Sequence, residues 1–353
     1  RWREDPVCDE FGSYIYLRDV GSGEVWSAGY QPLGREPDSY AVEFHEDHAL
    51  IERRDGYLHT SQEVLVSPED DAELRRVVIS NHGAVARDIE ITTYQELVLA
   101  PAGADAAHPA FSKMFVQTEY VAEGGVLLAR RRPRDPSEVS LWAAHLCIAD
   151  RPVIGVQQFE TDRSQFIGRG RSLRRPVAVM DARPLSNSVG TVLDPVLSLR
   201  RRVRIPPGES ATFTVWTLVA EHREAALQLA DKHRDAGAHE RVRTMAWTQA
   251  QMQLRFLDVD FQEAQLFQRL ANRVLYADDS LRAPSEVLAA NPDGPRLLWA
   301  HGVSGDLPIV LARIAEDSEL PVIRHLLRAH EYWRSKRLDV DLVILNERGG
   351  QEW

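Results

Sequence analysis

The period of hydrophobic residues changes once along this 353-residue chain, near residue 220. Between about Phe11 and Ala220, apolar and polar residues alternate over short segments, which is typical of β-strands. Beyond that point the apolar residues recur at helical spacing. Many short strands with no helices between them indicate a large antiparallel β-sandwich. We therefore expect a sandwich over 1–220, a helical linker over 221–296 and a third part over 297–353.

Turn and cap signals support this division. Val20-Gly21-Ser22-Gly23 lies between two strand-like segments, and Asp55-Gly56 lies between two more. Asp-Gly favours a two-residue hairpin turn, because Gly accepts the positive φ that such turns need. In the helical part, Asp260 precedes Glu263 by three residues, which is the spacing of a capping box at a helix start. Pro321 marks the first turn of another predicted helix.

The composition narrows the classes of partner. A formal net charge of -11 argues against a nucleic-acid partner held on a broad basic surface. No apolar run approaches about 18 residues, so we expect no transmembrane helix and no membrane contact by this segment. The 12 His show no metal-ligand spacing, and two Cys make neither a disulfide framework nor a metal site. We expect no metal and no resident cofactor.

A turn-rich loop between Leu298 and Pro308 is the first candidate site. It combines an indole, an imidazole, hydroxyl and carboxylate groups with two glycines. An aromatic ring packs on the apolar face of a pyranose, and glycine lets the backbone approach a ligand. The alternative is that the Asp before Leu307-Pro308 caps a helix that starts there. We predict a sugar-contacting loop formed by Trp299, His301, Gly302, Ser304, Gly305 and Asp306.

The first predicted hairpin and the segment after it are the second candidate. They could project onto a sugar pocket and help to close it. The alternative is that Arg18 and Asp19 pair across the turn while Trp26 lies in the core. The residues predicted to contact sugar are Arg18, Asp19, Trp26, Tyr30 and Gln31.

A long loop rich in Ala, Gly and Pro begins at Ala100 and carries His108 and Phe111. Long loops in compact domains are commonly functional. We predict that His108 and Phe111 contact the ligand, and the alternatives are a lid or a dimer contact.

Two arginine-rich segments are weaker candidates for binding an anion. Arg200, Arg202 and Arg204 alternate along one predicted strand and therefore share a face. Guanidinium groups suit phosphate, but a solvated face paired with the abundant Asp and Glu is the favoured interpretation. Gly168-Arg169-Gly170 lacks the strand-then-helix setting of a nucleotide-binding loop.

The order of these motifs carries a resemblance to a known family. With the run Leu298 to Pro308 after β-patterned and then helical sequence, the chain resembles the family 94 glycoside phosphorylases. More narrowly, it is similar to the phosphorylase-like region of bacterial cyclic β-1,2-glucan synthases. Further matching stretches cover nearly the whole chain in order: Tyr16 to Asp19, Glu24 to Ser27, Gln31-Pro32, Ser67 to Asp71, Ala107 to Ser112, Phe166 to Gly170 and Asp341 to Glu347.

The resemblance implies a β-supersandwich, a helical linker and the opening helices of an (α/α)6 barrel. It also implies inverting phosphorolysis of β-1,2-glucan in an intact protein, with phosphate as co-substrate and glucose 1-phosphate as product. The general-acid Asp of the family is expected beyond residue 353. We therefore assign no catalytic residue in this chain and expect the segment alone to be inactive.

The partners that the resemblance implies are a β-1,2-glucan oligosaccharide, the remaining barrel, an upstream glycosyltransferase domain of the same protein, and a second copy in a homodimer. It places the segment on the cytoplasmic side of the bacterial inner membrane. The alternative is a non-catalytic carbohydrate-binding, scaffolding or dimerisation module. Convergence of Trp26, Tyr30, Phe111 and Trp299 on one open cleft would favour binding.

Overall fold

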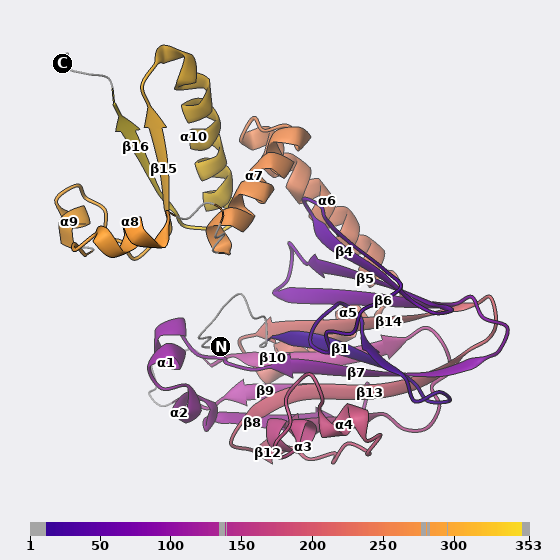
Figure 1. The fold of residues 1–353 in the computed structure, drawn as a ribbon. Helices are drawn as coiled ribbons and strands as arrows, with labels where there is room; N and C mark the ends of the chain where they lie inside the picture. Colours follow the sequence, from indigo (N-terminus) through magenta and orange to yellow (C-terminus); the bar gives the residue numbers. More distant parts are fainter. Residues whose placement is uncertain are drawn as a thin grey trace. The chain divides into compact units, whose positions relative to one another are not determined.

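The computed structural model describes residues 12–133, 138, 140–276, 280, 283–294 and 296–347. The chain divides into two units, Arg1–Gln249 and Ala250–Trp353, which are described separately. The first unit holds two antiparallel sheets, and the second holds a two-stranded parallel sheet with helices (Figure 1).

The smaller sheet of the first unit has five strands in the order β11-β13-β7-β1-β2. β1 and β2 form the hairpin predicted around residues 20–23, with Tyr16 opposite Ser27. β7 lies at the centre of the sheet, between β1 and β13. The strands are β1 (Ser13–Asp19), β2 (Val25–Ser27), β7 (Arg87–Glu96), β11 (Gln158–Asp162) and β13 (Pro195–Ile205).

The larger sheet has nine strands in the order β12-β8-β9-β10-β14-β6-β5-β4-β3. The turn predicted at Asp55-Gly56 is confirmed, because it joins β4 to β5 and Gly56 has a φ of +60°. The strands are β3 (Ser39–Phe44), β4 (His48–Asp55), β5 (Leu58–Val66), β6 (Ala72–Asn81), β8 (Val116–Val121), β9 (Val126–Arg131), β10 (Trp142–Ala149), β12 (Gly190–Thr191) and β14 (Ser210–Ala220).

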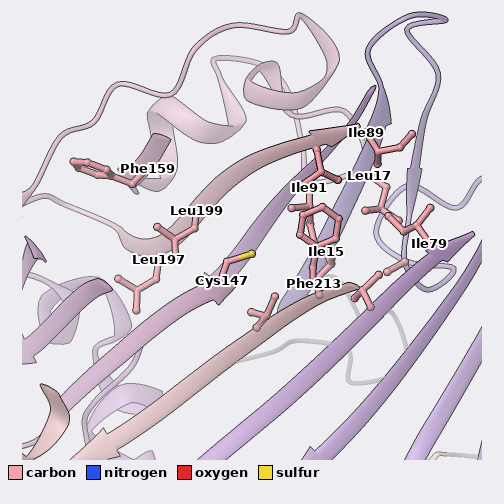
Figure 2. Close-up of a cluster of buried hydrophobic side chains, with 14 of the residues drawn as sticks. Ile15, Leu17, Ile79, Ile89, Ile91, Cys147, Phe159, Leu197, Leu199 and Phe213 are labelled. Carbon is pink, nitrogen blue, oxygen red and sulfur yellow. The ribbon is translucent and has the colours of Figure 1, made fainter. Parts of the chain in front are cut away.

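The main core lies between the inner faces of these two sheets (Figure 2). Both sheets contribute β-branched and aromatic side chains, which suit pleated buried surfaces. The labelled members are Ile15, Leu17, Ile89, Ile91, Phe159, Leu197 and Leu199 from the smaller sheet, and Ile79, Cys147 and Phe213 from the larger one.

Helices α5 (Arg223–Arg234) and α6 (Ala238–Phe256) follow the last strand of the sandwich. Ala226 and Ala230 of α5 pack in one buried cluster with Trp216 of β14. Lys232 of α5 donates to the Asp70 carboxylate at 2.8 Å. The first linker helices therefore belong to the first unit, and the boundary between the units falls within α6.

The second unit has a small core between α7 (Phe261–Leu275) and α10 (Leu320–Ser335). The predicted capping box at the start of α7 is confirmed, since Asp260 and Glu263 each accept from the other's backbone N–H. Trp333 of α10 is buried, and its Nε1 donates to the Phe267 carbonyl at 2.8 Å. The shorter helices are α8 (Ser285–Ala290), α9 (Arg296–Trp299) and η2 (Asp317–Glu319).

The segment after residue 297 differs from the helices expected there. β15 (Ile309–Ile314) and β16 (Asp341–Asn346) pair in parallel, and α10 connects them. Short apolar runs such as these cannot be assigned to a helix or a strand from periodicity alone. None of the described helices is both long and apolar enough to span a membrane.

Candidate functional site

The outer face of the five-stranded sheet carries an inserted segment between β11 and β13. This insertion contains α3 (Arg163–Ile167) and α4 (Val177–Met180). The Phe166 ring packs against the rings of Tyr16 and Tyr94, with centroids 5.8 and 5.0 Å away. The Tyr16 hydroxyl donates to the Leu173 carbonyl at 2.9 Å. These buried contacts fix the insertion to the sheet.

Local sequence explains the shape of the insertion. The Asp162 carboxylate accepts from the Ser164 backbone N–H at 2.8 Å and caps the start of α3. Gly168 ends α3 with a φ of +84°. A Cβ at Gly168 would lie 2.9 Å from Cβ of Val177, so only glycine lets the end of α3 approach α4 this closely.

A cavity of about 1060 Å³ opens over this insertion. Ligand pockets commonly have volumes of roughly 300–1,000 Å³, so this one could hold several sugar units. Five arginines and three carboxylates line it, which leaves an excess of positive charge. The lining includes Gln31, Pro32, Glu160, Arg163, Arg169, Arg171, Arg174, Asp181, Arg183 and Asp194.

Arg163 is held by several partners at one side of the cavity. Its Nε donates to the Tyr94 hydroxyl at 3.0 Å and lies 3.4 Å from the Glu96 carboxylate. Its Nη1 lies 3.6 Å from the Asp194 carboxylate. Burial alone would lower the pKa of Arg163, but Tyr94 and Asp194 raise it above its ordinary value. Arg163 is therefore a fixed, charged donor.

The other cavity arginines differ in how much they are held. Arg171 donates to both carboxylate oxygens of Asp181, at 2.7 and 3.0 Å, and this pair lowers the pKa of Asp181. Arg169 and Arg174 are exposed and form no ion pair with any residue that the structure describes. Their guanidinium groups are the donors that a ligand in the cavity could engage.

Arg200 lies beneath the insertion and is 4% exposed. It donates to the Thr92 hydroxyl and to the carbonyls of Arg183 and Ala178, at 2.6 to 2.9 Å. Burial lowers the pKa of Arg200, although Glu90 counteracts this effect. Arg200 is thus not on a solvated face, because these structural contacts occupy it.

The two arginines that follow along β13 pair with acids of β7, as the favoured interpretation of this strand predicts. Arg202 donates to Glu90 at 2.9 Å, and Arg204 lies 3.6 Å from Asp88. The face is therefore a ladder of paired charges, and its arginines do not form a phosphate patch.

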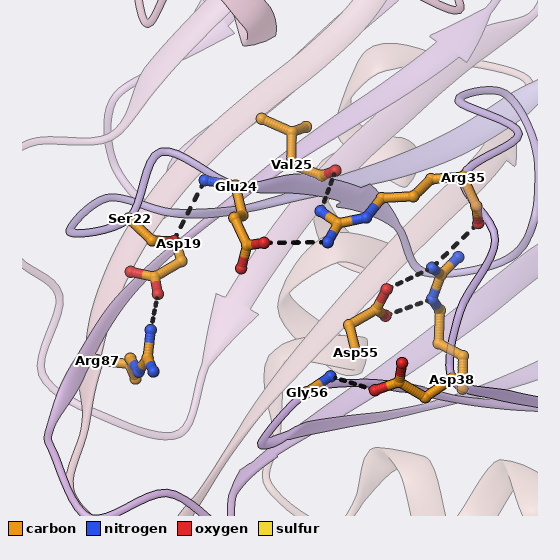
Figure 3. A network of polar contacts seen from close by, with 10 residues as sticks. Asp19, Ser22, Glu24, Val25, Arg35, Asp38, Asp55, Gly56 and Arg87 are labelled. Atoms are coloured by element: carbon orange, nitrogen blue, oxygen red, sulfur yellow. Dashed lines mark hydrogen bonds and ion pairs between the residues drawn. The ribbon is translucent and has the colours of Figure 1, made fainter.

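Two predicted sugar contacts in the first hairpin are wrong. Trp26 is 1% exposed, and its Nε1 donates to the Thr60 hydroxyl at 3.2 Å, so its ring offers no face to a sugar. Asp19 is equally buried and accepts from Gly21 N–H. It also accepts from Arg87 (Figure 3). Burial would raise the pKa of Asp19, but the Arg87 hydrogen bond lowers it below its ordinary value.

Arg18 does not pair with Asp19 across the turn. It lies opposite Glu90 of β7 and Val25 of β2 in the sheet register. Arg18 is partly buried on this outer face. The structure therefore places it on the charged ladder of the sheet and not among the residues that line the cavity.

Gln31 is the member of the first hairpin group that lines the cavity. Its segment is fixed by Arg53, which donates to both Asp55 oxygens and to the Gly29 carbonyl, each at 2.7 Å. Arg35 adds a bond to Glu24 at 3.1 Å (Figure 3). Tyr30 is partly buried, and its hydroxyl donates to a Glu36 carboxylate oxygen.

His108 lies between two short helices, α1 (Ala102–Ala107) and α2 (Pro109–Lys113), and Phe111 lies within α2. His108 is exposed, and Phe111 is half-exposed with its ring 5.1 Å from that of Phe115. Lys113 at the end of α2 lies 3.1 Å from the Asp194 carboxylate of the cavity. The predicted loop is thus tied to the cavity rim, although His108 and Phe111 do not line it.

The predicted Trp299 loop belongs to the second unit. Trp299 is 61% exposed, and its Nε1 donates to the Ser304 carbonyl at 3.1 Å. Gly302 and Gly305 have φ values of +74° and +80°, which only glycine adopts readily. His301 and Asp306 are exposed as well.

Asp306 does not cap a helix, because the chain after it enters β15. Its backbone N–H donates to the Ser304 hydroxyl at 3.1 Å. The loop therefore presents an indole face and polar groups on the surface of the second unit.

Sequence reasoning named Arg169 only within a weak candidate for anion binding, and it did not name the other arginines of the cavity as site residues. The available signal was the density of Arg and Gly between residues 163 and 183. The glycines of that segment do not fit a nucleotide-binding loop, but its arginines are hydrogen-bond donors that also suit other ligands. Among the described residues, no group of three or more His, Cys, Asp or Glu could hold a metal ion.

Comparison with known proteins identifies the family to which the sandwich belongs. Residues 1–236 match the family described as "Glycosyl hydrolase 94, supersandwich domain". The chain belongs to this family. The expected β-supersandwich is therefore confirmed by the family match and by the two antiparallel sheets.

Relatives of this glycosyl hydrolase 94 chain include a glucan synthase and phosphorylases. It is 38% identical over 99% of its length to the cyclic beta-(1,2)-glucan synthase NdvB of Rhizobium meliloti (strain 1021), of which it spans 12%. It is 26% identical over 62% of its length to the solabiose phosphorylase of Paenibacillus borealis, of which it spans 27%. The chain thus corresponds to a small part of each relative.

A solved bacterial glucoamylase complexed with acarbose is similar at a TM-score of 0.44 and 7% identity. The match covers 70% of this chain and 31% of the glucoamylase chain.

Proposed function

We propose that this chain is a segment of a cyclic β-1,2-glucan synthase and that its supersandwich helps to bind β-1,2-linked glucan. The observation that carries the proposal is the 38% identity to NdvB over 99% of the chain. The arginine-lined cavity of about 1060 Å³ on the five-stranded sheet is the proposed glucan site.

The chemistry of the cavity suits a polyhydroxylated ligand. The guanidinium groups of Arg169 and Arg174 donate hydrogen bonds, and the Gln31 amide both donates and accepts. Arg163 and Asp181 are already fixed by protein partners and would give the ligand a preformed rim. On the second unit, the exposed ring of Trp299 would supply a separate stacking surface for a sugar ring.

In the intact protein, the proposed reaction is inverting phosphorolysis at a chain end. Phosphate would attack the anomeric carbon of the terminal glucose while the glycosidic bond to the next unit breaks, and an acid of the remaining barrel would protonate the leaving oxygen, which gives glucose 1-phosphate and a shortened glucan. No catalytic residue is assigned in this chain. The proposed partners are the remaining barrel and an upstream glycosyltransferase domain of the same protein, on the cytoplasmic side of the inner membrane.

Calorimetric titration with β-1,2-linked gluco-oligosaccharides tests this proposal, with β-1,4-linked oligosaccharides as the control ligand. The proposal predicts linkage-selective binding that Arg174→Ala weakens about tenfold, since a hydrogen bond to a charged group contributes about 1.5–3 kcal/mol. Arg241→Ala, on the exposed side of α6, is the matched control and should leave the affinity unchanged. Equal heats for both linkages, or none, would contradict the proposal.

A scaffolding role is the second candidate. The burial of Trp26 favours it, because one of the four aromatic side chains expected to converge is part of the core. A scaffold would bind neither oligosaccharide and would leave recognition to other parts of the intact protein.

A further inference from the structure

The cavity over the insertion between β11 and β13 is lined by charged, polar and aliphatic side chains. None of the described residues that line it is Phe, Tyr or Trp. An aromatic ring is a common surface on which the apolar face of a pyranose packs. The cavity offers a sugar ring no such surface, so its charged groups dominate what it can recognise.

Two of the three carboxylates in the cavity are already paired with its own arginines. Asp181 lies 2.7 Å from Nη1 of Arg171, and Nε of Arg183 lies 3.9 Å from the same carboxylate. Asp194 lies 3.6 Å from Nη1 of Arg163. The cavity arginines that form no ion pair therefore receive no counter-ion from these two acids.

The third carboxylate, Glu160, is 2% exposed and is held by uncharged donors. It accepts hydrogen bonds at 3.0 to 3.1 Å from the backbone N–H groups of Thr161, Asp162 and Ser186 and from the Ser188 hydroxyl. Both of its oxygens take part in these bonds. Glu160 thus fixes the backbone of the insertion and is not a counter-ion for a guanidinium group in the cavity.

The turn that follows α3 carries the donors that remain unused. Arg169 and Arg174 are exposed. Gly168 and Gly170 flank Arg169 with φ values of +84° and +72°. Within the part of the chain that the structure describes, no group accepts a hydrogen bond from the N–H of Arg169 or Gly170. Successive N–H groups in such turns can bind an anion, and here two charged guanidinium groups accompany them.

We propose that this cavity binds a phosphate monoester of a sugar and that Arg169 and Arg174 hold its phosphate group. The sugar part of this ligand rests on the proposed function, and the phosphate is the new element. The planar fork of a guanidinium group matches two phosphate oxygens, and a phosphate monoester carries nearly two negative charges at neutral pH. The volume of about 1060 Å³ leaves room for a glucosyl unit beside the phosphate.

Calorimetric titration of the full chain with glucose 1-phosphate tests this site, with inorganic phosphate and neutral β-1,2-linked gluco-oligosaccharides as the other two ligands. Glucose 1-phosphate should bind more tightly than inorganic phosphate, because the sugar adds contacts. Arg169→Gln and Arg174→Gln should each weaken its binding at least about tenfold, since each removes a charged donor. Arg174→Lys keeps the charge and should lose less affinity than Arg174→Gln. Added salt should weaken the binding of glucose 1-phosphate but not that of the neutral oligosaccharides.

The matched control is Arg241→Gln, which changes an exposed arginine of α6 in the same unit and should leave the affinity unchanged. Thermal unfolding of all variants checks that the fold is retained. The proposal is overturned if glucose 1-phosphate does not bind, if inorganic phosphate binds as tightly, or if the two Gln variants bind as the unmodified chain does.

The same titrations separate this site from the proposed glucan site. Binding of the neutral oligosaccharides without binding of glucose 1-phosphate would overturn the phosphate site and support the glucan site. Binding of glucose 1-phosphate without binding of the neutral oligosaccharides would support the phosphate site and contradict the glucan site.

Discussion

The two units of this chain differ in how completely they bury their apolar side chains. In the first unit, two sheets, helix α5 and the insertion with α3 and α4 enclose three clusters, and Trp26 and Trp216 are fully buried. In the second unit, one cluster lies between α7 and α10, while Leu311 of β15 remains 55% exposed. A two-stranded sheet leaves apolar surface that a larger sheet would cover. We infer that the first unit is stable by itself and the second is marginal.

The largest expected effect is a loss of stability in the second unit, when a buried residue of its one cluster is removed. Trp333→Ala removes a buried indole and its bond to the Phe267 carbonyl, and should cost about 3–5 kcal/mol. Calorimetric unfolding should show a lower transition temperature for the second unit alone. Trp299→Ala removes an exposed indole and is the matched control, with a much smaller shift. A loss of the first unit's transition in Trp333→Ala would break the comparison.

The second-largest expected loss of stability concerns a buried ion pair of the first unit. Glu90→Ala leaves Arg200, which is 4% exposed, without its carboxylate partner. Removing one member of a buried ion pair costs about 3–5 kcal/mol, and the Thr92 and backbone contacts of Arg200 place this case at the lower end. Urea unfolding measures the loss.

The control for this network comes from the second unit. Glu347→Ala breaks an ion pair with Arg313 on an exposed surface and should cost far less than Glu90→Ala, because water screens the pair. Equal losses for the two glutamate variants would contradict the difference in burial between the units.

The pH dependence of stability should also separate the units. His145 is buried between Thr93 and Thr217, and burial lowers its pKa to about 3. The unfolded chain binds a proton near pH 6.5, whereas the folded first unit binds one only near pH 3. Stability is therefore greatest above pH 6.5 and falls by about 1.4 kcal/mol for each pH unit below it.

Urea unfolding of the first unit at pH 7 and pH 5 measures this slope. His233 titrates in the same window, because burial lowers its pKa as well, so the unmodified chain is compared with His145→Gln. The variant should show the shallower slope. His301→Ala, an exposed site in the second unit, should not alter the slope. Identical slopes for the unmodified chain and His145→Gln would show that His145 does not cause the loss of stability below pH 6.5.

The smallest expected effect concerns the open face of β15. Leu311→Ala should change stability by no more than about 0.5 kcal/mol, because the side chain is already half in water. Chemical unfolding of the second unit measures it. A loss above about 2 kcal/mol would show that this face is packed.

The difference between the two units also explains which parts of the fold could be predicted from the sequence. The hairpin before Glu24 and the turn at Gly56 were predictable, because turn chemistry and alternation are local signals. The β15–α10–β16 unit was not, because Ile309 to Ile314 is a short apolar run that suits a helix as well as a strand. The burial of Trp26 depends on contacts with Thr60, a residue distant in the sequence, which no local pattern reports.

The candidate site was predicted only in part, because contacts between residues distant in the sequence form much of it. Gln31 was named from the sequence and lines the cavity. Arg174 was missed and Arg169 was only a weak candidate, because the cavity that both residues line depends on the packing of Phe166 of the insertion against Tyr16 and Tyr94. The role of each residue in binding remains a prediction.

Hydrogen-exchange mass spectrometry of the full chain, with and without β-1,2-linked gluco-oligosaccharides, tests the central claim most directly. The account predicts that ligand slows exchange in the insertion over residues 163–186, with a smaller effect in the Trp299 loop. β-1,4-linked oligosaccharides should change neither region. Protection confined to the Trp299 loop, or absent from both regions, would contradict the claim that the supersandwich cavity binds the glucan.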